Sequence, residues 1–445
     1  MILGEWRIMP ENYWKKSVHN KTDFFSFTYD LTTPIKRDSF SFLKSFSYLF
    51  IVLFITSCGT QSGINKATRA DWSSELGSHS RDGRSEVEVL IPPLNLTSYH
   101  ISSYSNSTRK NPVNEKSSPV IYDNILYASS VFGKVSAIDL VSGDVLWSYK
   151  IKTNIEAGIG VSDEIVVIGD LDGTVYGIDR NSGELKWQTA LKSTILSSPL
   201  IDDTSLYIQT SDNKVYSLST ADGSSNWIYG RIDLGSVYRR YKTSIAMGDG
   251  KLFTMTSDGY LVAIDKKSGG EKWRIKVLND ALYADMLRTT PVFANDKVYA
   301  LNDNGNLSAY NKDTGKEVET YTFIKGKDFL VTENSIIFSA EGYLKAFSPS
   351  GLPLWSREYK KNSKPHTIIA TDNTLFSIYN MKSWGSTKSN IEALDLKSGT
   401  LLWKKRFSEP AYTALALSDS FAAFTANDGR VYVIQTNYPA SREDR

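Results

Sequence analysis

The chain has 445 residues, of which 12% are aromatic, and its 51 Lys and Arg side chains almost balance its 49 Asp and Glu side chains. A net charge of +2 leaves no basic excess to neutralise phosphates, which argues against a nucleic-acid partner. The single cysteine, Cys58, excludes an intrachain disulfide framework, a cysteine-based zinc site and an iron–sulfur site.

Residues 1–57 are predicted to be a leader that ends in an export signal. Residues 1–35 are polar and aromatic without clear periodicity, and they are either a disordered leader or an over-extended gene start. Lys36, Arg37 and Lys44 then precede an apolar run over 46–55. This run is too short to span a bilayer, and with its basic flank it is typical of a signal peptide.

The segment Ile55-Thr-Ser-Cys58 resembles the lipobox of bacterial lipoproteins. The resemblance implies cleavage before Cys58 and lipid on its sulfur and amine, with a signal anchor and a chance cysteine as the alternative. Gly59 is compatible with the outer membrane, because an Asp there would favour the inner membrane. Residues 58–85 are rich in Ser, Gly, Thr and charged residues, and they are predicted to be a flexible tether at the periplasmic face.

From residue 113 onward the sequence repeats one unit. The pattern Ala-Ile-Asp-x-x-Ser-Gly-x-x-x-Trp first occurs at 137–147 and returns, in intact or degraded form, with glycines 36 to 48 residues apart. A period of about 40 residues indicates a propeller or an array. The glycines and tryptophans of the structural repeat are Gly143, Trp147, Gly183, Trp187, Gly223, Trp227, Gly269, Trp273, Gly351, Trp355, Gly399 and Trp403.

Each unit contains four short strands. In residues 163–191, apolar or alternating runs are separated by turn signals at 172–173 and 181–183, which predicts antiparallel strands joined by hairpins. With the strand that opens each unit, the total matches one propeller blade. We expect the repeated glycine to supply a left-handed turn and the tryptophan to pack between neighbouring blades.

The third strand of the unit occurs eight times, which predicts an all-β, eight-bladed β-propeller of four-stranded antiparallel blades over residues 86–438. Residues 439–445 are left as a C-terminal tail. The eighth unit lacks a fourth strand, and an open ring would leave an unpaired edge. We therefore expect an N-terminal strand within 86–107 to close the ring.

Three connections are longer than the rest: 229–243, 278–290 and 381–390. Up-and-down strand order places all three on one face, with the first two in neighbouring positions. Their Arg, Tyr and Leu residues are typical of a protein-recognition patch, although an ordinary solvated loop is the alternative.

The sequence offers no catalytic constellation. Of the four histidines, His19, His79, His100 and His366, only His366 lies within the repeats. A nucleophile elbow, a phosphate loop and a histidine-rich metal motif are all missing. We therefore predict no catalytic, cofactor-binding or metal-binding residue and no enzymatic activity, although carboxylates from different blades could meet in space.

Over about residues 113–438 the repeat resembles that of pyrroloquinoline-quinone propellers. One branch, the quinoprotein alcohol and glucose dehydrogenases, binds the quinone and a calcium ion, and its alcohol members commonly add a disulfide of adjacent cysteines. The other branch is the BamB family of outer-membrane assembly lipoproteins. It implies a non-catalytic scaffold of the β-barrel assembly machinery that binds the periplasmic domains of the barrel-forming BamA subunit, beside other lipoproteins of the machinery.

The lipobox, the eight units and the missing adjacent cysteines and calcium constellation fit the BamB family better. A periplasmic quinone-dependent dehydrogenase and a glycan- or peptide-binding propeller remain alternatives. The family's partner contacts lie in two neighbouring loops, which match Val237-Tyr-Arg-Arg240 and Tyr283-Ala-Asp-Met-Leu-Arg-Thr-Thr-Pro291, with Arg288 where an acid is expected. The resemblance thus implies partner contacts by Val237, Arg239, Arg240, Tyr241, Tyr283, Asp285 and Arg288.

Overall fold

The computed structural model describes residues 72–85, 90, 92–102, 115–230, 242–279, 290–322, 326–340, 342–360, 363–383, 386–418 and 420–436. They belong to the larger of two compact units; the smaller unit, 9–69, lies outside the described residues. The predicted signal peptide and Cys58 therefore lie outside as well. No described helix is long and apolar enough to cross a membrane.

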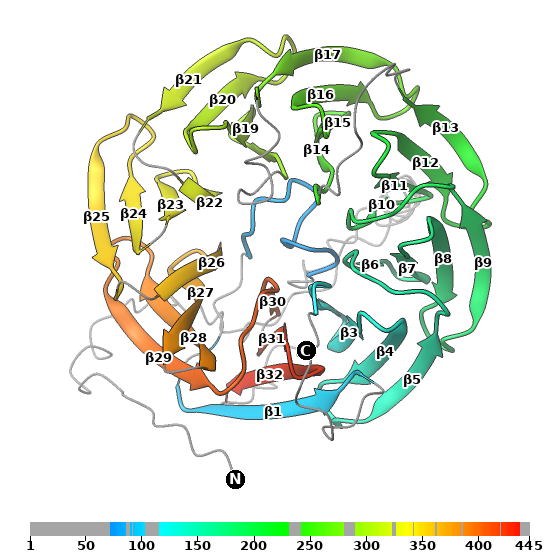
Figure 1. Ribbon diagram of the computed structural model, residues 1–445, viewed down its shortest axis with the longest axis horizontal. Coiled ribbons are helices and arrows are strands. Elements are labelled where there is room, and N and C mark those ends of the chain that lie inside the picture. The colour runs from blue at the N-terminus through cyan, green and yellow to red at the C-terminus, as the bar shows by residue number, and fades with distance from the viewer. Residues whose placement is uncertain are drawn as a thin grey trace, which may run out of the picture. The chain divides into compact units, whose positions relative to one another are not determined.

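The strands form eight four-stranded sheets arranged as blades around a ring (Figure 1). The first four blades contain β2 (Val120–Tyr122), β3 (Ile125–Ser129), β4 (Lys134–Asp139), β5 (Val145–Lys150); β6 (Gly160–Val161), β7 (Ile165–Gly169), β8 (Thr174–Asp179), β9 (Leu185–Ala190); β10 (Leu200–Asp202), β11 (Ser205–Gln209), β12 (Val215–Ser219), β13 (Ser225–Tyr229); and β14 (Ala246–Gly248), β15 (Lys251–Met255), β16 (Tyr260–Asp265), β17 (Glu271–Lys276).

Blades 5 to 8 follow in the same order. They contain β18 (Val292–Ala294), β19 (Lys297–Leu301), β20 (Leu307–Asn311), β21 (Glu317–Tyr321); β22 (Gly326–Val331), β23 (Ile336–Ala340), β24 (Tyr343–Phe347), β25 (Pro353–Glu358); β26 (Ser363–Ala370), β27 (Thr374–Ser383), β28 (Ser386–Asp395), β29 (Leu401–Phe407); and β30 (Ala416–Leu417), β31 (Phe421–Ala426), β32 (Arg430–Thr436), β1 (Leu94–His100).

An N-terminal strand closes the ring. Strand β1 is the outer strand of the eighth blade and pairs antiparallel with β32, from Leu94 opposite Thr436 to His100 opposite Arg430. The predicted eight-bladed fold and its closing strand within 86–107 are therefore confirmed. The pairing leaves the eighth blade with the same four strands as the others.

Burial follows the position of a strand within its blade. The second strands are buried on both faces because each blade is packed between two others; in β7 all five residues are buried. The outer strands are mostly exposed, and in β9 only Trp187 is buried. This explains why the sequence of each unit passes from a continuous apolar run to an alternating one.

The repeated tryptophan and glycine meet across neighbouring blades. Trp147 Nε1 donates a hydrogen bond of 2.8 Å to the Arg180 carbonyl in the next blade. Its ring lies against Gly183, whose φ is +75°, and a Cβ added there would come within 2.6 Å of the ring. The glycine therefore serves the turn and also makes room for the preceding blade's tryptophan. The same arrangement recurs for Trp187 with Gly223, Trp227 with Gly269, Trp273 with Gly315, and Trp355 with Gly399.

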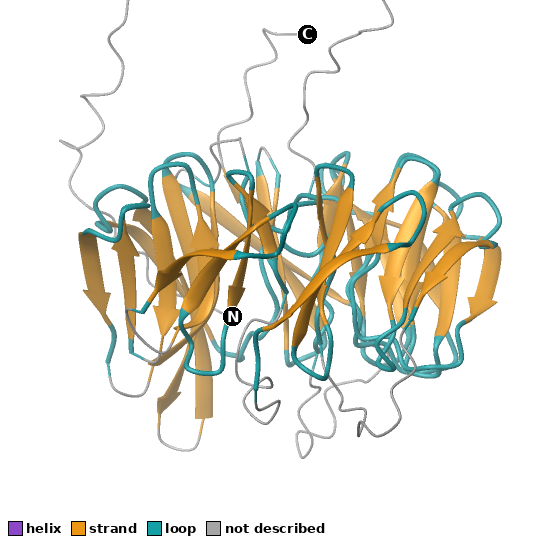
Figure 2. Ribbon diagram, turned by 90° about the horizontal axis from the view of Figure 1, so that it is seen from above, coloured by secondary structure: helices purple, strands orange, loops and turns teal. Residues whose placement is uncertain are grey.

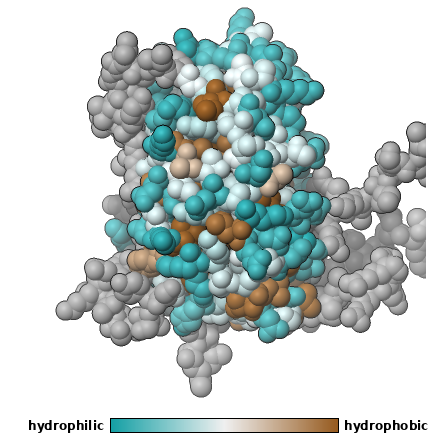
Figure 3. Space-filling view, turned by 90° about the vertical axis from the view of Figure 1, so that its right-hand side faces the viewer, coloured by the Kyte–Doolittle hydropathy of each residue, from teal (hydrophilic) through white to brown (hydrophobic). Residues whose placement is uncertain are grey.

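The outer surface carries scattered apolar side chains. Leu185 on β9 is 37% exposed and Ile228 on β13 is 56% exposed. On this side of the ring the apolar patches are small and separated by polar residues (Figure 3). Single exposed apolar side chains of this kind are normal on a soluble surface and do not by themselves mark a binding site.

Candidate functional site

The strand directions separate the ring into two faces. Because every described pair within a blade is antiparallel, the connections between blades and the loops between second and third strands lie on one face, here called the loop face. The repeated glycine turns lie on the other, the turn face. Residues 231–241 and 280–289 connect blades 3 to 4 and 4 to 5, so their flanking residues lie at the loop face. The hairpin of β27 and β28, the longest strands, also projects there (Figure 2).

The flanks of the two inter-blade loops are joined directly. The backbone N–H of Ser244 donates a hydrogen bond of 3.0 Å to Thr290 Oγ1. The Ser244 hydroxyl in turn accepts a bond of 3.2 Å from the N–H of Ser198 in blade 3. The described ends of both loops are thus neighbours, held over three successive blades. The predicted contact residues themselves, Val237, Arg239, Arg240, Tyr241, Tyr283, Asp285 and Arg288, lie outside the described residues.

Residues 72–85, here called the strap, run through the centre of the ring (Figure 1). They bond to inner strands or their flanks in blades 1, 2, 4, 5 and 7, through Trp72 N to Ile121 O (2.8 Å), Val161 N to Ser73 O (3.0 Å), Met247 N to His79 O (2.7 Å), Phe293 N to Ser80 O (3.1 Å) and Ser85 N to Ala370 O (2.9 Å). Trp72 is only 2% exposed. The prediction of a flexible tether up to residue 85 is therefore wrong for residues 72–85, because blade carbonyl and N–H groups pair with their polar backbone.

Arg81 holds the strap to the third and fourth blades. Its side chain is fully buried. Its Nε donates to the Ile245 carbonyl at 3.0 Å and its Nη2 to the Ser198 carbonyl at 3.1 Å, while Nη1 donates to the carbonyl of Glu75. A buried guanidinium is tolerated here because carbonyl oxygens satisfy its donors.

Glu75 ties the strap to the flank of the first partner loop. Its carboxylate lies 3.0 Å from the Lys242 ammonium, directly after residues 231–241. It also accepts hydrogen bonds from the hydroxyls of Ser118 and Ser198. Burial alone would raise the pKa of Glu75, but Lys242, Ser198 and Arg81 outweigh it and lower the pKa to about 2. The group is therefore ionised at neutral pH.

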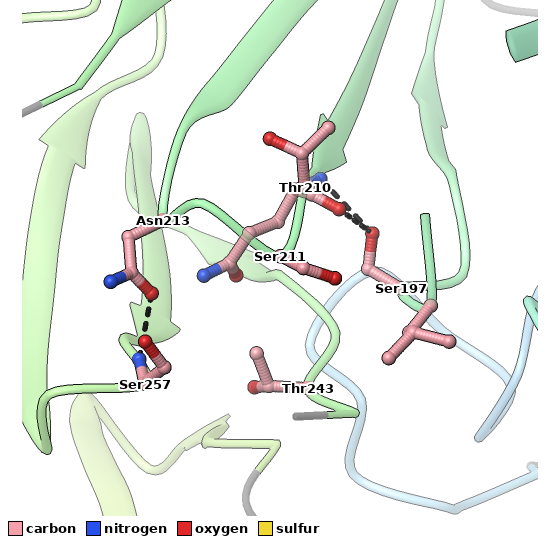
Figure 4. A pocket seen from close by; sticks show the side chains of 8 residues that line it. Ser197, Thr210, Ser211, Asn213, Thr243 and Ser257 are labelled. Carbon is pink, nitrogen blue, oxygen red and sulfur yellow. Dashed lines mark hydrogen bonds between the residues drawn. The ribbon is translucent and has the colours of Figure 1, made fainter. Parts of the chain in front are cut away.

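A small cavity lies next to Thr243, in the flank of the loop 231–241. Its volume is about 10 Å³, enough for a single water molecule and too small for a cofactor (Figure 4). Its polar lining is already paired in part: the N–H of Ser257 donates to Asn213 Oδ1 at 2.7 Å, and the Ser197 hydroxyl donates to the Gln209 carbonyl at 2.7 Å.

A wider groove of about 440 Å³ lies between blades 3 and 4, where Trp227 and Tyr207 meet the turn residues of blade 4. The two rings lie 5.9 Å apart, and the Lys266 ammonium pairs with the Asp202 carboxylate at 2.5 Å. The groove is open, and Asp202 and Lys266 in its lining are already paired with each other.

The three histidines of the described residues lie in separate parts of the fold. His79 lies in the strap, His100 ends β1, and His366 lies on β26. Among the described residues, no three His, Cys, Asp or Glu side chains lie close enough to hold a metal ion. The strap and its charged centre were missed by sequence reasoning; the isolated Trp72 was the one signal that this segment packs against something.

Comparisons with known proteins bear on this geometry. The family model described as "Outer membrane protein assembly factor BamB" matches residues 131–341 and 340–440, well over half of the chain. A comparison with curated proteins finds none that matches.

Solved structures show the same architecture. BamB from Moraxella catarrhalis is 20% identical, with a TM-score of 0.60, and the match covers 76% of this chain and all of that one. The quinohemoprotein alcohol dehydrogenase from Comamonas testosteroni is 12% identical, with a TM-score of 0.64, over 86% of this chain and 83% of that one. A computationally designed protein, Ika8, is 17% identical, with a TM-score of 0.57, over 73% of this chain and 98% of that one.

At these identities the solved structures show the fold alone, and they include both branches that the repeat resembles. The family model matches all eight blades at least in part, over residues 131–341 and 340–440. The chain belongs to the family of the outer membrane protein assembly factor BamB.

Proposed function

We propose that this chain is a non-catalytic scaffold of the β-barrel assembly machinery, which aids folding and insertion of outer-membrane β-barrel proteins. The observation that carries the proposal is the family match over residues 131–341 and 340–440. In this role the propeller binds the periplasmic domains of the barrel-forming subunit. A lipid on Cys58 holds it at the periplasmic face of the outer membrane.

The proposed partner site is the part of the loop face formed by 231–241, 280–289 and their flanks. Arg240, Tyr241, Arg239 and Val237 contact the partner from the first loop, and Tyr283, Asp285 and Arg288 from the second. The hydrogen bond between Ser244 and Thr290 supports this assignment, because it joins the flanks of the two loops. Arginine and tyrosine are the residue types that most often dominate the binding energy of protein interfaces.

Contacts inside the ring also hold the flank of the proposed partner site in place. Lys242 follows the first loop directly and is held by the Glu75 carboxylate at 3.0 Å and by the Lys116 carbonyl at 3.1 Å. Glu75 belongs to the strap, which Arg81 fixes to blades 3 and 4. Holding a loop end in place before binding lowers the entropy lost when the partner docks.

A pull-down from detergent-solubilised membranes of the native host tests the proposal. The bait is the tagged full-length chain, compared with an Arg240→Glu, Tyr241→Ala variant. The matched control is Lys267→Glu, which reverses a charge at an exposed turn-face residue of blade 4. We expect the barrel-forming subunit to copurify with the unchanged chain and the control, and to be lost from the double variant.

Two other outcomes have different meanings. Copurification with all three baits would keep the assembly role and overturn the assignment of the face. Copurification with none would contradict the assembly role. A quinone titration followed by absorbance and dye reduction would then test the dehydrogenase alternative.

A further inference from the structure

The outer edge of the contact between blades 6 and 7, here called the blade 6–7 interface, carries several cations. It is formed by β25 of blade 6 and by β27, β28 and β29 of blade 7, which lie in neighbouring blades (Figure 1). Arg357 and Tyr359 face it from blade 6, two and four residues after Trp355. On blade 7, cross-strand pairing sets Tyr379, Asn390 and Arg406 in one row. Glu392 and Lys404 lie in the next row of the same face.

An ion pair lies within this interface. Glu392 is fully buried, and Arg357 donates to both of its carboxylate oxygens, from Nε and Nη2, each at 3.1 Å. The Tyr359 hydroxyl donates to the same carboxylate. The Tyr359 and Tyr379 rings lie 4.8 Å apart. Among the described residues, Arg357 is the ion-pair partner of Glu392.

Further cations at the same interface have no carboxylate partner among the described residues. Lys404 lies over the Tyr379 ring at 5.1 Å, and no described carboxylate comes within ion-pair distance of Lys404, Arg406 or Lys360. Burial lowers the pKa of the Lys404 ammonium; Glu392 opposes this effect, and the three neighbouring cations strengthen it. Asn390, only 2% exposed, shares the row of Arg406, and its Nδ2 has no acceptor among the described residues.

The repeats provide an internal comparison. The residue two after the tryptophan is uncharged in blades 1 to 4, where it is Tyr149, Thr189, Tyr229 and Ile275. Blade 4 has cations at the positions equivalent to Lys404 and Arg406, but there Arg274 lies 3.7 Å from the Glu271 carboxylate and Lys276 donates to the Asp258 carbonyl. In blade 4 the two cations thus have a carboxylate or carbonyl partner, whereas Lys404 and Arg406 in blade 7 have neither among the described residues.

We propose that the outer edge of the blade 6–7 interface is a second docking site, which binds an extended acidic peptide segment of a partner protein. The charge complementarity comes from Lys404, Arg406 and Lys360, with the two tyrosines as an apolar floor. Lys404 and Arg406 lie two residues apart on one strand, about 7 Å, which is the spacing of alternate side chains in an extended peptide. Arginine with tyrosine is typical of protein-recognition sites.

These cations suit a carboxylate on a peptide better than a membrane surface. Lys404 is half-buried, so a flat layer of lipid headgroups reaches its ammonium less readily than a single acidic side chain does. The site is separate from the loops proposed to bind the barrel subunit, which connect blades 3 to 5. Its binding can therefore be measured without that subunit, and either proposal can fail alone.

The test uses the full-length chain in detergent and a fluorescein-labelled peptide of alternating Asp and Ser, followed by fluorescence anisotropy. A peptide with Asn in place of Asp is the ligand control. The protein variant is Lys404→Gln with Arg406→Gln, and the matched control is Arg274→Gln with Lys276→Gln in blade 4. A charge-preserving variant, Lys404→Arg with Arg406→Lys, tests for rescue, and melting curves verify that every variant folds.

We expect the Asp peptide to bind in a salt-dependent manner, and the blade 7 variant to weaken it at least about tenfold, while the blade 4 variant changes affinity less than about twofold. The charge-preserving variant should retain most of the affinity. The proposal is overturned if neither peptide binds, if both bind equally, or if the two glutamine variants weaken binding alike. It is also overturned if the Lys404→Gln, Arg406→Gln variant binds phosphatidylglycerol vesicles or inorganic phosphate more weakly than the unchanged chain does, while its affinity for the peptide is unchanged.

Discussion

The Lys242 ammonium lies 3.0 Å from the Glu75 carboxylate, which joins two residues 167 positions apart in the sequence. Glu75 belongs to the strap through the centre of the ring, and Lys242 is the described residue that follows loop 231–241. The segment that leads from the N-terminus into the propeller therefore meets the flank of the proposed partner loop. Changes in the strap are expected to affect both the stability of the ring and the loop face.

Replacing Glu75 with Gln should remove a pH-dependent stabilisation. The folded pKa of about 2 is below the ordinary value of 4.5, so the carboxylate stabilises the fold above pH 4.5 and this contribution is lost as the pH falls through 2. The difference corresponds to about 3 kcal/mol. Denaturant unfolding of both proteins from pH 2 to 7 measures it; the two free energies should differ at pH 7 and converge near pH 2.

Glu184→Gln is the control for that series, because Glu184 is an exposed residue of the blade 2 turn. Its unfolding free energy should stay close to that of the unchanged chain at every pH. A gap between the Glu75 variant and the unchanged chain that stays constant down to pH 2 would show that the ionised Glu75 is not the source of the stabilisation.

Replacing Arg81 with Met should destabilise the ring strongly. The substitution removes the donor for the Ile245, Ser198 and Glu75 carbonyls in a fully buried position, which corresponds to at least about 3 kcal/mol. Arg84→Met is the matched control, since Arg84 makes one ion pair of 3.5 Å with the exposed Asp372 and should contribute under about 1 kcal/mol. Equal melting temperatures for the two variants would mean that the strap does not hold the blades.

Glu115 should give the opposite pH dependence. It is fully buried, and burial raises its pKa to about 7, although the N–H of Val131 and the Ser130 hydroxyl oppose the shift. A raised folded pKa means that its contribution is complete below pH 4.5 and is lost as the pH rises through 7, by about 3 kcal/mol. Between pH 4.5 and 8, Glu115→Gln should therefore gain stability relative to the unchanged chain. A constant difference in unfolding free energy between the two proteins across that range would contradict this prediction.

The contact between Trp147 and Gly183 predicts that a larger side chain at Gly183 destabilises the fold. Gly183→Ala places a methyl group within 2.6 Å of the Trp147 ring at a positive φ, and should cost about 3 kcal/mol from overpacking and strain together. Gly250→Ala has a similar φ of +71° but open space around the new methyl group, so strain alone should cost about 1 kcal/mol. Calorimetric melting of both variants separates the two effects; equal losses would leave no role for the tryptophan contact.

The blades could be predicted from the sequence because each unit encodes its own hairpins locally. Turn signals such as 181–183 recur at a regular distance from apolar runs, and the repetition removes the ambiguity of any single strand. The closing strand followed from counting, since the eighth unit ended after β32 and an unpaired edge had to be covered.

The strap could not be predicted, because its composition is that of a solvated segment. Ser, Gly and charged residues are buried there only because groups from six blades, which are distant in the sequence, surround them. Arg81, for example, is satisfied by carbonyls 117 and 164 residues away. The blade 6–7 interface could not be predicted either, because it depends on the strand registers of two blades at once, although Arg357 could have been noticed as a charge at a position that is uncharged in blades 1 to 4.

The most direct test of the assembly role is a depletion experiment in the native host. The measured quantity is the fraction of outer-membrane β-barrel protein that reaches its folded, heat-modifiable form after the chain is depleted. We predict that this fraction falls, that the unchanged chain and Lys267→Glu restore it, and that Arg240→Glu with Tyr241→Ala does not. An unchanged folded fraction after depletion would contradict the role, and full restoration by the double variant would contradict the proposed site.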